Sequence, residues 1–277
     1  MLDELLARLH EGMVILYALC ILLYFIDFVQ NDQKVNRIAF WLLAIVWVLQ
    51  SSFLALYMID TGRFPVLTIF EGLYFYAWVL VTLSLAINRM LRVDFTVFFT
   101  NILGFVIMVI HTFAPVQVHS EAISEFLRSE LLVIHVTMAF ISYGAFTLSF
   151  VFSLLYLIQY KWLKEKRWNK RLQRLTDLQR LETLSYWSTI IGVPMLLLSL
   201  ILGLQWSVIS LDGVPWFDSK IIGSFFVLLL YGWIIYLRLR KGIFGKRLAM
   251  WNSAAFLFVL INFLTTSRLS TFHVWYS

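Results

Sequence analysis

Residues 131–160 read LLVIHVTMAFISYGAFTLSFVFSLLYLIQY and contain no Asp, Glu, Lys or Arg. A helix rises about 1.5 Å per residue, so a run of this length crosses the roughly 30 Å hydrocarbon core of a bilayer with residues to spare. Strands of an outer-membrane barrel would instead alternate polar and apolar residues. The stretch therefore predicts a membrane-spanning helix.

The rest of the chain has the same character. It is 61% hydrophobic and only 14% charged over 277 residues, and its mean hydropathy is +0.83. A soluble domain is about half apolar and a quarter charged, so this composition excludes a soluble enzyme, a disordered chain and a separate folded domain outside the membrane. We expect an all-α integral membrane protein, a single polytopic domain with a bundle of about eight transmembrane helices. The other seven apolar stretches are 12–30, 38–59, 67–88, 95–114, 186–204, 220–238 and 249–267.

The basic residues predict how these spans are oriented. Of the 22 Lys and Arg residues, 17 fall in the connections that follow the odd-numbered spans. Lys and Arg resist translocation, so we expect those connections in the cytoplasm and both termini outside. The first span follows acidic residues and has no small-residue cleavage site, which favours a retained span over a signal peptide. The single cysteine, Cys20, excludes an internal disulfide and a CxxC pair.

The longest cytoplasmic connection, 161–185, is strongly basic. Its apolar residues recur at three- and four-residue spacing, which predicts an amphipathic helix on the inner leaflet or an extension of the preceding span. Such a segment can serve only to fix topology, or it can dock a cytoplasmic partner. The apolar residues in question are Trp168, Leu172, Leu175, Leu178 and Leu181.

All five histidines fall at or near the outer side in this topology. His10 and His119 have the positions of ordinary interfacial residues, and His111 ends a span. His135 opens the fifth span and His273 follows the last one. Two imidazoles on different helices at one depth could hold a haem iron from both faces.

The outer loop at 205–220 carries aromatic and acidic residues around a Gly/Pro turn. Aromatic side chains at this level often serve as interfacial anchors. Three of them with two carboxylates could also form a platform for a flat, hydrophobic ring system. The candidate residues are Trp206, Trp216, Phe217, Asp212 and Asp218.

Two charged residues lie near the ends of spans. Glu71 sits one or two turns below the outer surface, where a carboxylate is costly unless it is paired or hydrogen-bonded. It is therefore either a functional residue or a buried hydrogen-bonding one. Arg268, five residues before His273, could neutralise Glu71 or a haem propionate, or its side chain could simply reach the surface.

These features, in this order, resemble the haem-handling membrane proteins of cytochrome c assembly, such as the CcsA/ResC and CcmC proteins. The segment from Pro65 to Leu73 is similar to the family's Pro-x-x-Asn-x-Tyr-Glu-Ser-Leu motif, with Thr68, Phe70 and Gly72 as replacements. The helix with His135 resembles the one that carries the family's first external haem-ligand histidine, and His273 matches the second. The resemblance covers most of the chain from about Pro65 onward.

The chain also departs from that pattern. The family's tryptophan-rich external segment is reduced to Trp216-Phe217-Asp218-Ser219-Lys220, and the inner halves of the spans contain no histidine. These departures and the chain length resemble the HemX-type branch of the family. The resemblance implies haem b as a possible cofactor, ligated by His135 and His273 and contacted by Trp206, Trp216, Phe217 and Asp218, with Glu71 and Arg268 nearby.

The resemblance further implies a role in haem biosynthesis, through the level of glutamyl-tRNA reductase, in the plasma membrane of a Gram-positive bacterium. The segment 161–185 is then the candidate contact for that cytoplasmic protein. Two alternatives stay open: a component that delivers haem to a cytochrome c maturation partner, and a haem-free scaffold or transporter. The residues form no nucleophile–base–acid set and no phosphate loop, so we expect a protein without enzymatic activity. The basic residues are explained by topology and membrane lipid, which leaves no sign of nucleic-acid binding.

Overall fold

The computed structural model describes residues 2–65, 69–91, 94–113, 130–166, 176–210 and 216–269, and these contain helices but no strand. Seven of the eight helices in these ranges are long and apolar enough to cross a membrane, which makes the chain a multi-pass membrane protein. The eighth, α10, begins with two basic residues and falls outside that set. The helices are α1 (Leu2–Gln30), α2 (Gln33–Thr61), α3 (Ile69–Leu91), α4 (Asp94–Phe113), α6 (Glu130–Lys164), α8 (Leu178–Ser210), α9 (Ser219–Lys241) and α10 (Lys246–Leu269).

Local sequence signals explain where two of these helices begin and end. The Asp32 carboxylate accepts a hydrogen bond from the backbone of Lys34 at the start of α2, and Asp218 does the same for Lys220 at the start of α9. Both helices end on a glycine in the left-handed region, Gly62 with φ 62° and Gly242 with φ 61°. Asp is a preferred N-cap, and glycine adopts this conformation without a Cβ clash.

The helices divide into two compact units. The single polytopic domain expected from the sequence stays a prediction. The first unit holds α1–α4. Within it α1 packs on α2 and α4, and α3 packs on the same two neighbours, so contacts join the four helices in a closed ring. Buried aromatic and aliphatic side chains fill its centre, among them Tyr17, Leu43, Leu80 and Met108.

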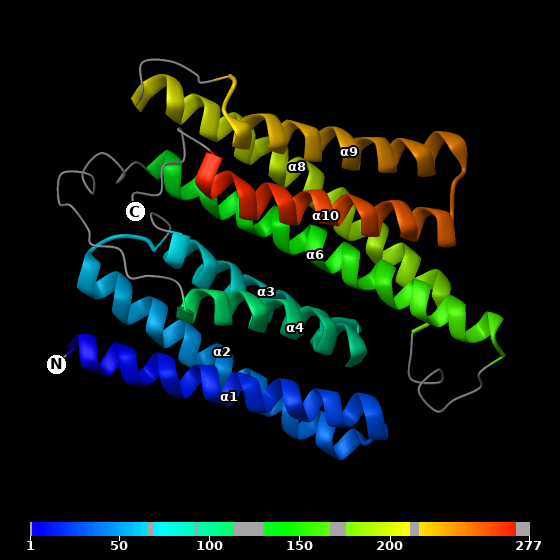
Figure 1. The fold of residues 1–277 in the computed structure, drawn as a ribbon, viewed down its shortest axis with the longest axis horizontal. Helices are drawn as coiled ribbons and strands as arrows, with labels where there is room; N and C mark the ends of the chain where they lie inside the picture. Colours follow the sequence, from blue (N-terminus) through cyan, green and yellow to red (C-terminus); the bar gives the residue numbers. More distant parts are fainter. Residues whose placement is uncertain are drawn as a thin grey trace. The chain divides into compact units, whose positions relative to one another are not determined.

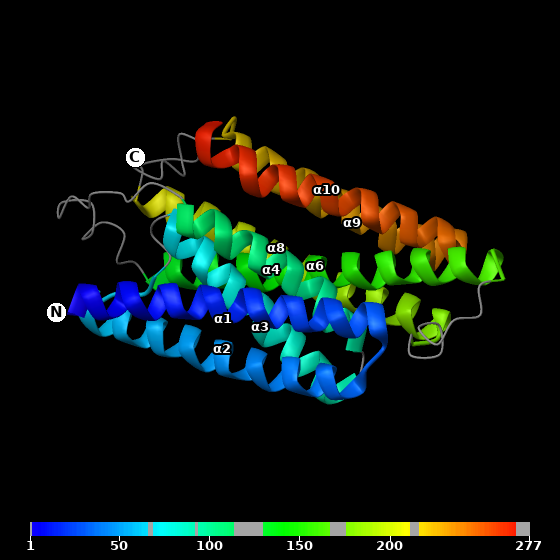
Figure 2. The same ribbon diagram turned by 60° about the horizontal axis from the view of Figure 1, so that its bottom comes forward.

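The second unit holds α6, α8, α9 and α10. Its most extensive contact joins α6 to α8, and α10 lies along both α6 and α9 (Figures 1 and 2). Small hydroxyl residues let α6 and α8 approach closely, as is common between membrane helices. The Ser142 hydroxyl donates to the Gly192 carbonyl at 2.8 Å, and the Ser149 hydroxyl donates to the Ser185 carbonyl at 2.7 Å.

Most of the helices extend beyond the apolar stretches from which they were predicted. The loop expected to begin at residue 205 begins later, because α8 continues to Ser210 and places Trp206 inside the helix. No Gly or Pro interrupts the chain between residues 205 and 210, whereas Gly213 and Pro215 follow. In the basic segment 161–185, α6 runs to Lys164 and α8 begins at Leu178, so Leu178 and Leu181 belong to the same helix as the sixth span. Trp168, Leu172 and Leu175 lie outside the described residues.

Candidate functional site

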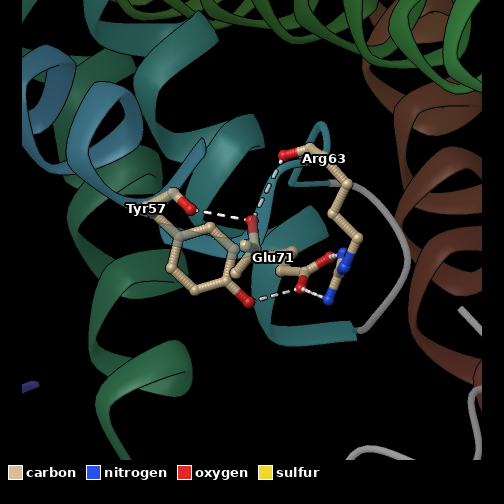
Figure 3. A network of polar contacts seen from close by, with 4 residues as sticks. Tyr57, Arg63 and Glu71 are labelled. Carbon is tan, nitrogen blue, oxygen red and sulfur yellow. Dashed lines mark hydrogen bonds and ion pairs between the residues drawn. The ribbon is translucent and has the colours of Figure 1, made fainter. Parts of the chain in front are cut away.

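Glu71 lies in a buried polar network at the junction of α2 and α3 (Figure 3). The guanidinium of Arg63 donates two hydrogen bonds to its carboxylate, Nη1 to Oε2 at 3.0 Å and Nη2 to Oε1 at 2.8 Å. The Tyr57 hydroxyl donates a third, to Oε1 at 2.6 Å. The side chains of Arg63 and Glu71 are only 9% and 5% exposed. A buried carboxylate thus has a paired cation and a phenol beside it.

The end of α2 explains how Arg63 reaches Glu71. Gly62 turns the chain in the left-handed region, and the hydroxyl of Thr61 donates to the Tyr57 carbonyl at 2.7 Å and contacts the Arg63 carbonyl at 3.3 Å. Burial alone would lower the pKa of the Arg63 guanidinium, but its hydrogen bonds with Glu71 and the charge of Glu71 raise that pKa overall. Arg63 therefore remains charged and pins the start of α3 to the end of α2.

His135, in the second turn of α6, is held by α8. Its Nδ1 atom lies 2.6 Å from the Ser199 carbonyl, and a carbonyl only accepts, so Nδ1 carries the proton. The Ser199 hydroxyl donates back to the His135 carbonyl at 3.0 Å. In the neutral ring this leaves the lone pair on Nε2, the arrangement usual for histidines that bind metals. The donor chemistry of His135 thus fits an iron ligand.

A glycine on α8 makes room for this imidazole. A Cβ added at Gly203 would lie 2.6 Å from Cε1 and 2.8 Å from Nδ1 of His135, far inside van der Waals contact. Gly203 follows Ser199 by one turn, so both residues face the same side of the helix. Ser199 and Gly203 together form the surface of α8 against which the ring of His135 is oriented.

A second pair of histidines lies in the first unit. The ring centroids of His10 on α1 and His111 on α4 are 4.9 Å apart, with an angle of 57° between the planes. The Tyr74 ring packs against both, at 6.2 Å and 5.4 Å, and Phe53 packs against His10 and Tyr74. All four helices of the unit therefore contribute a ring to this cluster.

The aromatic residues expected to contact haem have different environments. Trp206 is buried in the last turns of α8, at 5% exposure, whereas Trp216 and Phe217 are 60% and 95% exposed. The Asp218 carboxylate is buried and caps α9 through the backbone of Lys220, at 2.9 Å. Asp218 thus positions the start of α9 directly after two exposed aromatic side chains.

Other candidates fall where the structure gives no side-chain placement. His119, His273 and Asp212 lie outside the described residues, and for Arg268 only the helix backbone is described. The pairing of His135 with His273 and the reach of Arg268 toward a carboxylate therefore stay predictions.

Sequence reasoning missed the partners that hold the candidate residues. Arg63 counted only as a basic residue of an outer connection, although an arginine eight positions before an intramembrane glutamate is a candidate partner. Nothing in the sequence marks Tyr57, Ser199 or Gly203 as a candidate, because an aromatic residue, a serine and a glycine are each common in membrane helices. Only the packing of α2 on α3 and of α6 on α8 brings them to Glu71 and His135.

Comparison with known proteins adds the family. The model of the cytochrome C assembly protein family matches residues 66–273. The chain is 57% identical to Protein HemX of Bacillus subtilis (strain 168) over 277 residues, all of both chains. It is 47% identical to Protein HemX of Brevibacillus brevis over 97% of this chain and 98% of that one. A cytochrome c biogenesis protein CcsA of Prochlorococcus marinus (strain MIT 9301) is 28% identical over 74% of this chain and 73% of its own.

Proposed function

The chain belongs to the cytochrome c assembly protein family, as a HemX-type member, and from this premise we propose that it binds haem at the outer face of the plasma membrane and reports haem status to haem biosynthesis. The proposed role is one of binding, without a chemical step of its own. Two relatives from Bacillus subtilis and Brevibacillus brevis support a bacterial plasma membrane as its location.

The observation that carries the proposal is the orientation of His135. Its Nδ1–H is committed to the Ser199 carbonyl and its ring lies against Gly203. Hydrogen bonds of this kind fix the tautomer and the direction of a ligating imidazole. In an ordinary interfacial histidine, neither the tautomer nor the ring position needs to be fixed from a second helix.

The other proposed contacts come from the sequence and the family. His273 would be the second axial ligand, with Trp206, Trp216 and Phe217 covering the ring and Arg268 beside a propionate. Bound haem supplies an iron that imidazole ligates and a flat apolar surface that aromatic side chains cover. Glu71 would act indirectly, since Arg63 and Tyr57 already engage its carboxylate.

The proposed output is the level of glutamyl-tRNA reductase, with the segment 161–185 as the cytoplasmic contact. Its basic character and three- to four-residue apolar spacing support a docking role. We would replace its Lys and Arg residues by Gln. If this changes neither the membrane topology nor the reductase level, the contact lies elsewhere.

The ligand is tested by spectroscopy. We would purify the protein in detergent from haem-replete cells and record its reduced absorption spectrum beside His135→Ala, His273→Ala and, as a matched control, His119→Ala. The proposal expects a sharp low-spin spectrum that broadens or disappears in the first two variants and persists in the third. A wild-type protein without a Soret band, even after haem is added, would overturn it and leave a haem-free scaffold or transporter.

A second candidate function is delivery of haem to a cytochrome c maturation partner. The similarity to a cytochrome c biogenesis protein over 226 residues favours keeping it in view. Complementation separates the two functions. In a strain that lacks a maturation component, a protein with that function restores covalent c-type haem. A regulator changes the level of glutamyl-tRNA reductase and does not restore covalent c-type haem.

A further inference from the structure

The ring cluster of the first unit contains a histidine nitrogen that has no hydrogen-bond partner among the described residues. The Thr112 hydroxyl donates its only proton to the Met108 carbonyl at 2.9 Å. Toward Nε2 of His10, 3.1 Å away, that hydroxyl can therefore only accept. His10 thus carries its proton on Nε2, and in the neutral ring its lone pair is on Nδ1.

That lone pair is buried without compensation. Nδ1 of His10 has no access to solvent, and none of the described residues donates a hydrogen bond to it. An unsatisfied buried acceptor is unfavourable, so native structures rarely keep one without a reason. A bound cation, a buried water molecule or a proton from a ligand can satisfy it.

The neighbours of this nitrogen have the chemistry of metal ligands. Two imidazoles that bind one ion at about 2.0 Å, with a tetrahedral angle between them, place their ring centroids about 5 Å apart. The centroids of His10 and His111 are 4.9 Å apart. Met13, one turn along α1 from His10, is completely buried, and its Sδ accepts a hydrogen bond from the Tyr74 hydroxyl at 3.3 Å. The Tyr74 ring thus links the thioether to both imidazoles.

We propose that His10 and His111, with the thioether of Met13, form a site for Cu(I). Imidazole suits several transition metals, but a thioether beside it selects a soft ion. Among the described residues, no Cys, Asp or Glu joins the two histidines to complete a zinc site. Phe53 and Tyr74 pack against the cluster, Phe53 on the rings of His10 and Tyr74. The site belongs to the first unit alone and requires no haem.

The test measures copper directly. We would titrate the full-length protein in detergent, under ascorbate, with Cu(I) held by a coloured bidentate chelator, and follow the transfer of copper from the chelator to the protein. The wild type is expected to take up one equivalent. His10→Phe and His111→Phe, which keep an aromatic ring in the cluster, are expected to weaken binding at least tenfold. Met13→Leu is expected to weaken it several-fold for Cu(I) and to leave the weaker binding of Zn²⁺ unchanged.

Two further variants make the result specific. Tyr74→Phe keeps the covering ring and should retain copper, while His135→Ala should retain copper even if its haem spectrum is lost. Failure of the haem proposal and failure of this one are therefore distinguishable. Equal copper uptake by the wild type and the two phenylalanine variants would overturn the site, and tighter binding of Zn²⁺ than of Cu(I) would overturn the choice of metal.

Discussion

The two units contain buried polar networks of different kinds. The first unit buries full charges, since the carboxylate of Glu71 and the guanidinium of Arg63 meet where α2 ends and α3 begins. The second unit also buries the carboxylate of Asp218, but its network between α6, α8 and α10 consists of neutral groups. The Asn252 amide donates to three hydroxyls in that network, which consists of Ser149, Ser153, Ser185 and Thr189.

The difference teaches how each unit should respond to substitution. Removing one partner of a buried ion pair leaves an uncompensated charge, which costs far more than the pair itself contributes. Removing one member of a hydroxyl network leaves neutral groups that can bond to one another, and hydrogen bonds between membrane helices average only about 0.6 kcal/mol. We therefore expect a single substitution at the ion pair to cost the first unit much of its stability. Single substitutions in the hydroxyl network should each cost the second unit little.

Glu71→Gln should have the largest effect. The variant leaves the Arg63 guanidinium buried without its counter-charge, so we expect a loss of about 3–5 kcal/mol in the free energy of unfolding. Thermal unfolding in detergent, followed by circular dichroism, measures it. The double variant Arg63→Met with Glu71→Leu should recover most of the loss, because the unpaired charge is then gone; a double variant as unstable as the single one contradicts this account.

Gly203→Ala should have the next largest effect. This variant tests the close packing of an imidazole ring in the second unit, where the previous one tested a buried ion pair in the first. The added Cβ would overlap the imidazole of His135, and overpacking of this kind costs about 1–3 kcal/mol. If haem binds at His135, its reduced spectrum should broaden as well. Gly232→Ala in α9 is the matched control, since a Cβ there meets nothing within 4 Å. Equal behaviour of the two variants would show that the close approach of Gly203 to His135 is not tight.

Tyr57→Phe should have a smaller effect. The variant removes a single hydrogen bond to the Glu71 carboxylate while Arg63 still neutralises the charge. Hydrogen bonds to charged groups contribute about 1.5–3 kcal/mol, and the lower end applies here because one partner remains. Thermal unfolding in the Arg63→Met/Glu71→Leu background should show almost no further loss, and a full loss there would mean that Tyr57 acts through other contacts.

Asn252→Ala should have the smallest effect. The amide is the hub of the network in the second unit, but the hydroxyls of Ser149, Ser153 and Ser185 also bond among themselves and to backbone carbonyls. We expect a loss of about 1 kcal/mol, read from thermal unfolding. A loss as large as that of Glu71→Gln would break the contrast between the two units.

Most of the fold could be predicted from the sequence because hydrophobicity alone determines where membrane helices lie. Each of the eight apolar stretches corresponds to one helix. The ends were less accurate, since the helices continue through polar residues outside the apolar core, as α8 does to include Trp206. The caps at Asp32 and Asp218 show that short-range signals set some of these ends.

The sequence predicted individual residues of the candidate site, but it did not predict the residues that contact them. Glu71 and His135 stand out because a carboxylate or an imidazole is rare in a membrane helix. Arg63, Ser199 and Gly203 are ordinary in sequence, and only helix packing gives them a role. His10 had the position of an ordinary interfacial residue, and the structure adds that its ring packs into a cluster formed by four helices.

The pairing of Arg63 with Glu71 has a consequence for the biogenesis of the protein. The two residues are only eight positions apart, so the bond can form within the hairpin of α2 and α3 as soon as that hairpin has emerged from the ribosome. A hairpin that neutralises its own carboxylate passes through the lateral gate of the translocation channel at a lower cost in free energy than a single helix with an exposed charge. The second and third spans are thus suited to enter the lipid together, before any later helix has been synthesised.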